Sequence, residues 1–531
     1  MTSTNLKSAT ISVVPDAVVA SPNAAVPERR NTYGQILKSS AVIGGSSVLN
    51  IAMGIVRTKA MALLLGPAGV GLMGIYNSIL DLTRTVAGMG VNGSAVRQIA
   101  EASGTGDSSQ IARTVTALRR VVLVLSALGA VALVLLSNPI SRVSFGDTLH
   151  TGAVAMLAAA VFFATLSSGQ TALLQGVRRI GDLARTSVLG GLLGTISSVL
   201  IVYFLRNRGI VLAVVSVAAM TGLASWWYSR RIQIERCVLS LRAISSEASE
   251  LLKLGFVFMA SGFMMMGVGY FVRIIVLRKM GADAAGFYQA AWTLGGLYVG
   301  FILQAMGADF FPRLTAASQD NKECNRLVNE QAEISLLLAG PGIIGTLVFA
   351  PMVIQVFYSG KFGPAVEILR WICLGMMLRV ASWPMGFIVL AKGARQPFFW
   401  TELVSNSVQL LLVWFGVSLF GLNGTGMAFF AGYLVYWGLI YCVVRWMSGF
   451  RWSHENKQIG TVYGCLIAVV FVAWYFLPAW AITLGGGVLT LITGVQSLRR
   501  LCKLVPPGRL PRLVQRALVL LKIAPESENN R

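Results

Sequence analysis

The sequence is short of charge, and above all of acidic charge. Only 12% of its 531 residues are charged, with 21 Asp and Glu against 44 Lys and Arg. A soluble domain carries about a quarter charged residues, so an ordinary soluble protein is excluded. The basic residues form short clusters between apolar runs. This spacing is typical of loops facing anionic lipid and argues against nucleic-acid binding.

Residues for metal binding, disulfide bonding and ATP hydrolysis are also scarce. The only two histidines, His150 and His454, lie far apart in the sequence, and the six cysteines include no CxxC pair. The chain contains no GxxxxGK[ST] motif and so does not supply its own ATPase. We therefore expect no disulfide, no metal site and no cofactor.

Apolar runs of about 20 residues are abundant instead, and each is long enough to cross a bilayer as a helix. Hydrophobic residues make up 55% of the chain and its mean hydropathy is +0.70. The prediction is an all-α integral membrane protein with about 14 transmembrane helices. We expect them at 35–62, 68–90, 119–137, 151–175, 186–204, 209–228, 251–277, 285–309, 332–358, 366–391, 399–420, 424–445, 459–477 and 479–497.

The distribution of Lys and Arg predicts that both termini are cytoplasmic. In that orientation the inner loops and tails hold 32 of the 44 basic residues and the outer loops hold seven, as the positive-inside rule requires. Residues 1–33 are predicted to be a disordered cytoplasmic tail, because Pro15 and Asp16 break their apolar patch. Residues 499–531 are predicted to be a basic cytoplasmic tail, with an amphipathic helix on the membrane over 509–523.

A repeat with an offset of 215 residues relates the two halves of the chain. It superimposes Gly54 on Gly269, Gly66 on Gly281 and Gly71 on Gly286 without a gap. Each unit contains six helices, so both units have the same topology and are expected to pack about a pseudo-two-fold axis along the membrane normal. The predicted divisions are an N-lobe (34–231), a C-lobe (249–446) and a further helix pair (459–498).

Charged side chains within the spans mark a candidate site. Each costs about 2.5–3.5 kcal/mol to insert at the centre of a bilayer, and such residues almost always face a bundle interior or a wet cavity. Arg57, Asp81, Arg84, Arg273 and Arg379 are of this kind. Four of the five are cationic, which suits a polyanionic headgroup, because the guanidinium fork matches phosphate oxygens.

Each of these residues also has a purely structural interpretation. Asp81 and Arg84 are expected near the middle of the span 68–90 and are spaced to form an ion pair with each other. Arg57 and Arg273 are placed to extend to the outer interface. Arg379 has no acidic neighbour in its own helix and is the strongest candidate for a cavity role.

The remaining polar residues of the spans are weaker candidates. Arg370 is expected to extend to the interface or to pair with Glu367. Glu402 suits either an interfacial carboxylate or a proton carrier. For Asn50, Gln304 and Asp309 we favour interhelical hydrogen bonds over a cavity role, and Pro384 and the segment 340–342 (GPG) are hinges or static kinks.

The segment LLLGPAGVGLMGIYNSILDLTRTVAGMGVNGSAVRQIAEA (63–102) resembles the polysaccharide transporter family. This family contains the O-antigen and enterobacterial-common-antigen flippases and belongs to the multidrug/oligosaccharidyl-lipid/polysaccharide exporter superfamily. The turn LGPAGVGLMG and the segment GMGVNGSAVRQIAEA carry the similarity, which covers about residues 34–446. The turn recurs in the second half as MGADAAGFYQA.

The resemblance implies a cationic cavity between two lobes and transport by alternating access. The implied substrate is an undecaprenyl-diphosphate-linked oligosaccharide repeat unit of O-antigen or exopolysaccharide in the bacterial inner membrane. Its diphosphate would bind Arg379, Arg57, Arg84 and Arg273, with ion coupling at Asp81 or Glu402. Expected partners are this lipid, membrane lipids, a polysaccharide polymerase and a chain-length regulator, with no nucleic acid, and the chain is expected to be monomeric.

Three alternatives compete with this interpretation. A lipid II flippase also has fourteen helices and differs in its headgroup. A multidrug or cation antiporter would need a more acidic cavity. An enzyme such as a polymerase would need a large outer loop, whereas the longest hydrophilic loops predicted here are inner ones (91–118, 229–250 and 310–331). We therefore expect a transporter and not an enzyme.

Overall fold

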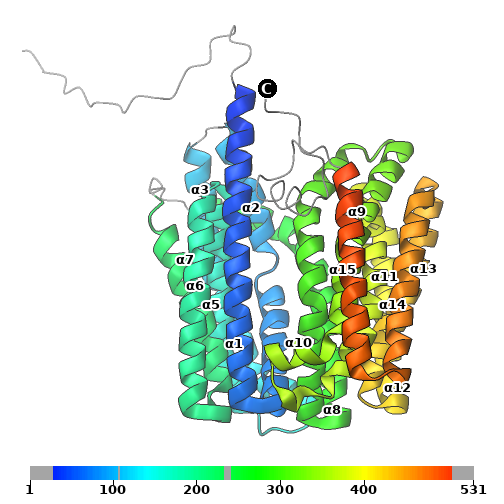
Figure 1. The fold of residues 1–531 in the computed structure, drawn as a ribbon. Coiled ribbons are helices and arrows are strands. Elements are labelled where there is room, and N and C mark those ends of the chain that lie inside the picture. The colour runs from blue at the N-terminus through cyan, green and yellow to red at the C-terminus, as the bar shows by residue number, and fades with distance from the viewer. Residues whose placement is uncertain (1–27, 106–107, 233–240, 505–531) are drawn as a thin grey trace, which may run out of the picture.

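The computed structural model describes residues 28–105, 108–232 and 241–504 (Figure 1). Every regular element in these ranges is a helix, which confirms the all-α class. The elements are α1 (Glu28–Ala87), α2 (Val91–Thr105), α3 (Ser108–Leu135), α4 (Ser137–Phe145), α5 (Thr151–Gly176), α6 (Ile180–Leu205), η1 (Arg206–Gly209), α7 (Ile210–Ser229), α8 (Leu241–Ala316), α9 (Asn321–Val348), α10 (Ala350–Phe357), η2 (Gly360–Phe362), α11 (Ala365–Ala391), α12 (Arg395–Phe420), α13 (Asn423–Ser448), α14 (His454–Phe476) and α15 (Ala479–Leu504).

Two of these helices, α1 and α8, each reverse direction at a glycine. Gly66 has φ 68° and Gly281 has φ 87°, a left-handed region that glycine enters without steric penalty. These are the two glycines that the 215-residue repeat superimposes. Each separates two predicted spans, 35–62 from 68–90 and 251–277 from 285–309, so the turn of the repeat is confirmed in both halves.

The helices form two lobes that lie side by side in Figure 1, α1–α7 in one and α8–α13 in the other. Each lobe has its own apolar core, and each core includes side chains from the other lobe's bent helix. Tyr270 and Ile274 of α8 belong to the N-lobe core, and Ala62 and Val70 of α1 belong to the C-lobe core. The exchange is symmetric, as expected for two copies of one unit.

The two ends of the molecule differ in what they contain. The end at which α1 begins and α15 finishes is called the terminal end (upper part of Figure 1), and the end with Gly66 and Gly281 is called the turn end. Within the described ranges, ten stretches are long and apolar enough to span a membrane. Two of them, Gly44–Ala87 and Ile180–Ser229, each contain two predicted spans. With the two arms of α8, every predicted span overlaps a helix, and the span 332–358 overlaps two.

Some predicted boundaries were wrong. The first helix begins at Glu28, inside the predicted tail 1–33. The predicted span 332–358 is broken after Val348, where α10 begins with Pro351 in its first turn. The three predicted hydrophilic loops are largely helical, because α2, α3, α8 and α9 extend into them. Residues 1–27 and the predicted amphipathic helix at 509–523 lie outside the described residues.

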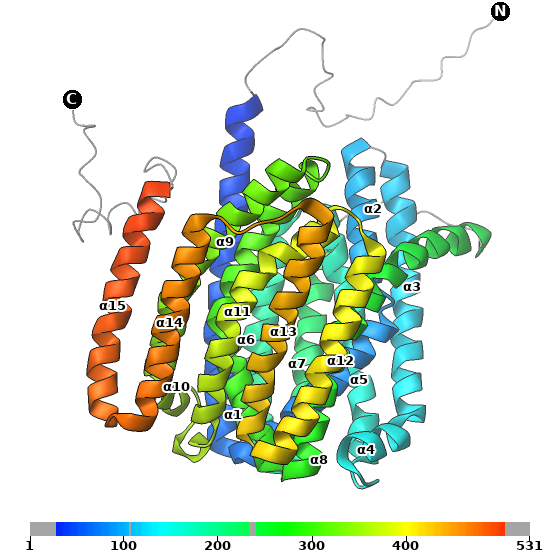
Figure 2. The ribbon, with the colours of Figure 1, turned by 90° about the vertical axis from the view of Figure 1, so that its right-hand side faces the viewer.

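The helix pair α14–α15 is fastened to the C-lobe at both ends (Figure 2). At the turn end, the guanidinium of Arg370 lies over the ring of Trp474 at 3.9 Å, and the Tyr475 hydroxyl donates to Glu367 at 3.1 Å. At the terminal end, Asn456 Nδ2 donates to the backbone oxygen of Asn329 at 2.8 Å. The pair is therefore part of the C-lobe and moves with it.

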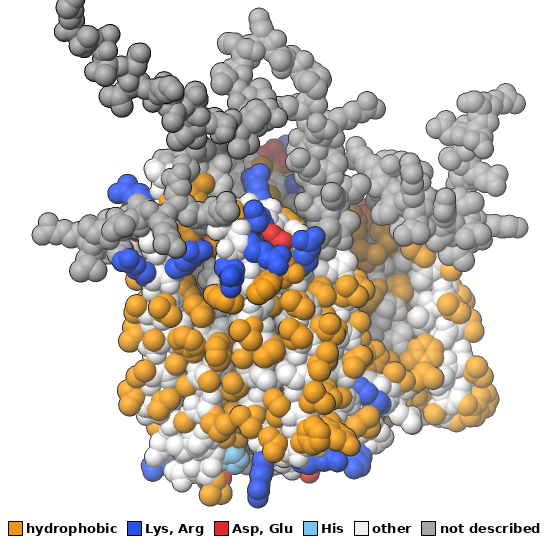
Figure 3. Space-filling model, turned by 90° about the vertical axis from the view of Figure 1, so that its left-hand side faces the viewer, with side chains coloured by type: hydrophobic (Ala, Val, Ile, Leu, Met, Phe, Trp, Pro, Cys, Tyr) orange, Lys and Arg blue, Asp and Glu red, His pale blue; other side chains and the backbone are white. Residues whose placement is uncertain are grey.

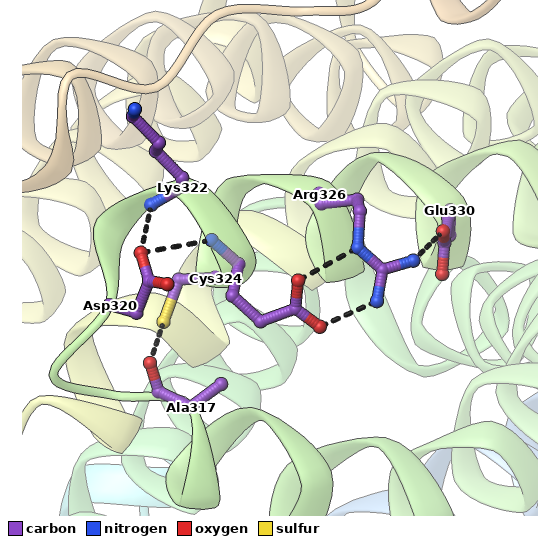
Figure 4. A network of polar contacts seen from close by, with 7 residues as sticks. Ala317, Asp320, Lys322, Cys324, Arg326 and Glu330 are labelled. Carbon is purple, nitrogen blue, oxygen red and sulfur yellow. Dashed lines mark hydrogen bonds and ion pairs between the residues drawn. The ribbon is translucent and has the colours of Figure 1, made fainter.

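The turn between α8 and α9 is held rigidly at the terminal end (Figure 4). Asp320 caps α9 by accepting from the backbone nitrogens of Lys322 at 2.8 Å and Glu323 at 3.3 Å, and Arg326 pairs with Glu323 and Glu330. Lys392, just after α11, donates to the Ser318 carbonyl at 2.9 Å. These bonds fix α9 relative to α11, the helix that carries Arg379.

Candidate substrate site between the lobes

The two lobes touch closely at the turn end. A Cβ atom built on Gly286 would lie 1.9 Å from the Pro67 carbonyl oxygen, and one built on Gly71 would lie 2.3 Å from the Ala282 carbonyl oxygen. Real Cβ atoms do not approach this closely, so only glycine fits at either position. Gly71 and Gly286 are a repeat pair, so the pseudo-two-fold axis passes between them.

Three hydrogen bonds link the lobes around this contact. The Ser144 hydroxyl lies 2.7 Å from the Tyr270 hydroxyl, and Arg278 donates to the Arg142 carbonyl. Lys59 donates to the Gln355 carbonyl at 2.8 Å. Together with the glycine contact, these bonds close the turn end of the interface.

A surface hollow of about 660 Å³ lies beside these bonds, between the α4–α5 turn and the turn of α8. Leu72, His150 and Arg278 line it. The His150 ring stacks on Phe145 with 4.0 Å between centroids. Its hydrogen bond to Asp147 lowers the pKa of that carboxyl, so Asp147 carries its charge at neutral pH.

Toward the terminal end the lobes are also in close contact, where the turn between α1 and α2 meets the first arm of α8. A Cβ on Gly90 would lie 2.0 Å from the Gly255 carbonyl oxygen, which joins the second arm of α1 to the first arm of α8. On the other side, where the first arm of α1 faces the second arm of α8, glycines have open space. Nothing lies within 4 Å of a Cβ built on Gly44, Gly45, Gly54, Gly296 or Gly300.

Two of the predicted arginines act on one carboxylate at the interface between the lobes. Arg84 lies 3.6 Å from Asp81, and Arg273 of the other lobe also acts electrostatically on Asp81. Arg273 donates from Nε to Gln289 Oε1 at 2.8 Å and to the Gly269 carbonyl at 2.8 Å. Two guanidinium groups therefore act on one carboxylate, Arg84 as an ion pair and Arg273 from beyond ion-pair distance, and the three side chains carry a net positive charge.

The position of this cluster corrects one prediction. Asp81 and Arg84 were expected near the middle of their span, but α1 ends at Ala87 and Arg84 lies in its last turn. The pair is about half exposed, at 47% and 48% of the side-chain surface. It is therefore accessible from the terminal half of the interface, and the predicted Asp81–Arg84 ion pair is confirmed.

Arg379 belongs to a separate group inside the C-lobe. It lies at the middle of α11 (Ala365–Ala391) and interacts electrostatically with Tyr436 of α13. Tyr436 also interacts with Glu402 of α12, which lies beside Asn406. Across the described ranges, no carboxylate comes within ion-pair distance of Arg379. The structure does not place this group in contact with the Asp81 cluster.

The other predicted residues differ in their burial and in their bonding partners. Arg57 is partly buried and forms no ion pair within the described ranges. Arg370 is buried and pairs with Glu367, which confirms the structural alternative. Asn50 donates to Ser187 at 2.7 Å, the interhelical bond expected for it. Gln304 is exposed, and the side chain of Asp309 lies outside the described set.

Sequence reasoning missed Gln289 and Tyr436, which are uncharged and gave no signal alone. The repeat contained a hint for Gln289, because it occupies the position of Gly74, and a Cβ on Gly74 would lie 2.8 Å from its Oε1. A large polar residue facing its small repeat counterpart indicates a contact across the axis. Tyr436 had no comparable marker.

Neutralising Asp81 should change stability little. The Asp81–Arg84 pair is half exposed, and such pairs contribute about 0–1 kcal/mol. We expect Asp81→Asn to lower the apparent thermal midpoint of the purified protein by no more than the control Glu101→Gln, which breaks the exposed Arg97–Glu101 pair on α2. A loss of folded protein specific to Asp81→Asn would show that Asp81 is a structural counterion for Arg273.

Together, the fold and the interface define a multi-pass membrane protein with two helical lobes. The interface between the lobes includes the basic side chains of Arg84 and Arg273. The family model described as "Polysaccharide biosynthesis protein" matches residues 60–367, and the chain belongs to this family. This confirms the resemblance found in segment 63–102.

Similar proteins agree with this assignment. The lipid III flippase of Escherichia coli (strain K12) is 23% identical over 419 residues, covering 76% of this chain and 97% of that protein. A putative O-antigen transporter of Shigella flexneri is 28% identical over 160 residues, covering 30% of this chain and 38% of that protein.

Two solved structures show the same fold. The lipid II flippase MurJ in an inward closed conformation has a TM-score of 0.64 at 13% identity, covering 87% of this chain and 98% of MurJ. An inward-facing MATE-family transporter of the MOP superfamily has a TM-score of 0.62 at 18% identity, covering 78% of this chain and 96% of that chain. The predicted two-lobe architecture is thereby confirmed.

Proposed function

We propose that the protein is a flippase that moves an undecaprenyl-diphosphate-linked oligosaccharide repeat unit of O-antigen or exopolysaccharide across the bacterial inner membrane. The observation that carries the proposal is that Arg84 and Arg273, which belong to different lobes, both act on the single carboxylate of Asp81, Arg84 through an ion pair and Arg273 from beyond ion-pair distance. Such a cluster attracts a phosphate group and changes shape when the lobes move. The relatives named as flippases support the same class of substrate.

In this proposal the terminal end is cytoplasmic, and the structure is closed at the periplasmic turn end. The diphosphate and sugars enter from the cytoplasm between the first arm of α1 and the second arm of α8, where the glycines have open space. The polyprenyl chain stays in the lipid. Rocking of the lobes about Gly71 and Gly286 then separates the turn end and exposes the headgroup outside.

The membrane potential favours this direction of transport. With the inside negative, moving two negative charges outward releases about 4.6 kcal/mol per 100 mV, at about 2.3 for each charge. Arg84, Arg273, Arg57 and Arg379 neutralise the diphosphate in the apolar surroundings. Asp81 or Glu402 takes up a cation to return the empty, positively charged site.

A lipid II flippase is the second candidate. The helix pair α14–α15 favours it. The fourteen-helix fold aligns with MurJ over 87% of this chain, and the contact of Arg370 with Trp474 fixes the pair to the C-lobe. The two candidates differ in the sugar headgroup, and the arginine cluster would serve the diphosphate of either.

Transport in vesicles of defined lipid tests both candidates. The protein is reconstituted with a fluorescent undecaprenyl-diphosphate oligosaccharide or with lipid II, and the fraction reached by an impermeant reagent is measured over time. We expect faster exposure of the oligosaccharide lipid than of lipid II, and loss of that activity in Arg273→Gln. Equal rates with empty vesicles for both lipids would refute the flippase proposal.

The proposed orientation makes its own prediction. Reporter fusions near residues 105, 320 and 453, all at the terminal end, should read cytoplasmic, and so should one near residue 240. Fusions near residues 145 and 361, at the turn end, should read periplasmic. A periplasmic reading at residue 453 would reverse the direction assigned to the whole cycle.

A further inference from the structure

Five exposed arginines gather at the terminal end of α5, α6 and α7. They are called the arginine patch and comprise Arg178, Arg179, Arg185, Arg230 and Arg231. Figure 3 shows this side of the molecule: a broad apolar band covers the helices, and Lys and Arg side chains crowd its upper edge with little acidic surface among them. The band marks the hydrocarbon region, so the patch lies at the depth of lipid phosphates.

Helix packing brings the two halves of the patch together. Positions on antiparallel α6 and α7 meet in register, since a Cβ on Gly190 would lie 3.0 Å from Thr221 Cα and one on Gly194 3.3 Å from Val217 Cα. Continuing this register toward the terminal end places Asp182 opposite Ser229. Arg179 and Arg185, which flank Asp182, therefore neighbour Arg230 and Arg231.

Aromatic rings hold the second half of the patch in place. The guanidinium of Arg230 lies 4.8 Å from the centroid of Trp226, and that of Arg231 lies 5.3 Å from the centroid of Trp227. Trp226 and Trp227 are themselves 47% and 49% exposed. Tryptophans at the membrane interface beside stacked arginines present preorganised donors at the headgroup level.

The first half of the patch offers a second phosphate-binding feature. Helix α6 begins after Arg179 without a side-chain cap, and an uncapped helix N-terminus favours an anion. Arg178, in the turn before it, has φ 56°, a left-handed conformation that disfavours arginine. Asp182 is the only acidic residue in segments 176–190 and 223–232 and lies 3.5 Å from Arg179 and 3.3 Å from Arg185. Four positive charges remain uncompensated.

We propose that the arginine patch is a binding site for the headgroup of an anionic phospholipid in the leaflet at the terminal end. The lipid phosphate accepts hydrogen bonds from the guanidinium groups and from the first turn of α6, and its acyl chains lie along the apolar face of α6 and α7. The site lies outside the interface between the lobes, so its occupancy is independent of the transported substrate.

Native mass spectrometry of the full-length protein tests the site. Protein from nanodiscs of equimolar phosphatidylcholine and phosphatidylglycerol is analysed for retained lipid. We expect the wild type to retain phosphatidylglycerol in preference to phosphatidylcholine. The double variant Arg230→Gln/Arg231→Gln should retain about 25-fold less, since each basic residue near an anionic surface contributes about a factor of five.

The opposite end of the same helices provides a matched control. Arg206 and Arg208 are also exposed, and Arg206 lies 5.9 Å from the centroid of Tyr203. Arg206→Gln/Arg208→Gln removes the same charge and should leave lipid retention unchanged. Arg178→Asn, which suits the left-handed turn, guards against misfolding and should also lower retention. Equal retention in all variants, or equal loss in the control, would overturn the proposal.

Discussion

Replacing Arg379 with alanine should abolish complementation of a flippase-deficient strain while membrane levels of the protein stay normal. Arg379 lies at the middle of α11, and within the described ranges it pairs with no carboxylate. The loss removes a charge-assisted contact to the diphosphate, worth about 1.5–3 kcal/mol or roughly ten- to a hundredfold in affinity. Folding is not penalised, because a charge within a membrane-spanning helix is removed. Complementation and immunoblotting of membranes measure the two effects.

Two further variants separate binding from structure. Arg379→Lys should be partly active, because it keeps the point charge but loses the bidentate fork. Arg445→Ala removes an exposed arginine from the last turn of α13 and should have no effect. If Arg379 is instead a structural partner of Glu402 through Tyr436, the alanine variant should be poorly expressed, and Arg379→Ala/Glu402→Gln should restore its level. Full activity of Arg379→Ala would remove this residue from the site.

Gly286→Ala should prevent closure of the turn end and so stop the transport cycle. The added methyl group would lie 1.9 Å from the Pro67 carbonyl oxygen and 3.0 Å from the Pro67 Cα. Backbone atoms cannot rotate away, so the lobes must separate locally, at a cost of about 1–3 kcal/mol as for other overpacked sites. We expect at least a tenfold lower transport rate, since about 1.4 kcal/mol changes an equilibrium tenfold.

A thiol-labelling experiment detects the opened end directly. A cysteine at Leu72, in the surface hollow beside the contact, should react faster with an impermeant maleimide in the Gly286→Ala background. Gly464→Ala on α14 serves as the control, because it lies outside the interface between the lobes and nothing lies within 4 Å of its added methyl group. Unchanged labelling together with normal transport in Gly286→Ala would show that this contact does not limit closure.

Movement of the lobes would change several polar contacts between them at the same time. The hydrogen bonds of Lys59, Tyr270 and Arg278 break when the turn end opens. Separation of the joined arms of α1 and α8 would also change the distance from Arg273 to Asp81, because these residues belong to different lobes. In the proposed cycle, opening of the turn end would therefore change the charge that a bound diphosphate experiences.

Several features of this protein were determined by the sequence alone. The spans were recognisable because about 20 apolar residues are needed to cross a bilayer. This requirement concerns one continuous stretch of the chain and does not depend on how the helices pack. The turns at Gly66 and Gly281 were recognisable because a left-handed residue within a repeated motif is almost always glycine. The Asp81–Arg84 pair followed from spacing along one helix.

The tertiary structure decided which of the candidate residues meet. Spacing along a chain does not say which separate helices pack together. The effect of Arg273 on Asp81, about 190 residues earlier in the chain, and the approach of Tyr436 to Arg379 and Glu402 therefore became visible only after packing. The same holds for the end of α1 at Ala87, which moved Arg84 from the middle of its span to the last helical turn. Hydrophobicity sets where a helix lies in the membrane, but side-chain packing between helices sets which charges share one cavity.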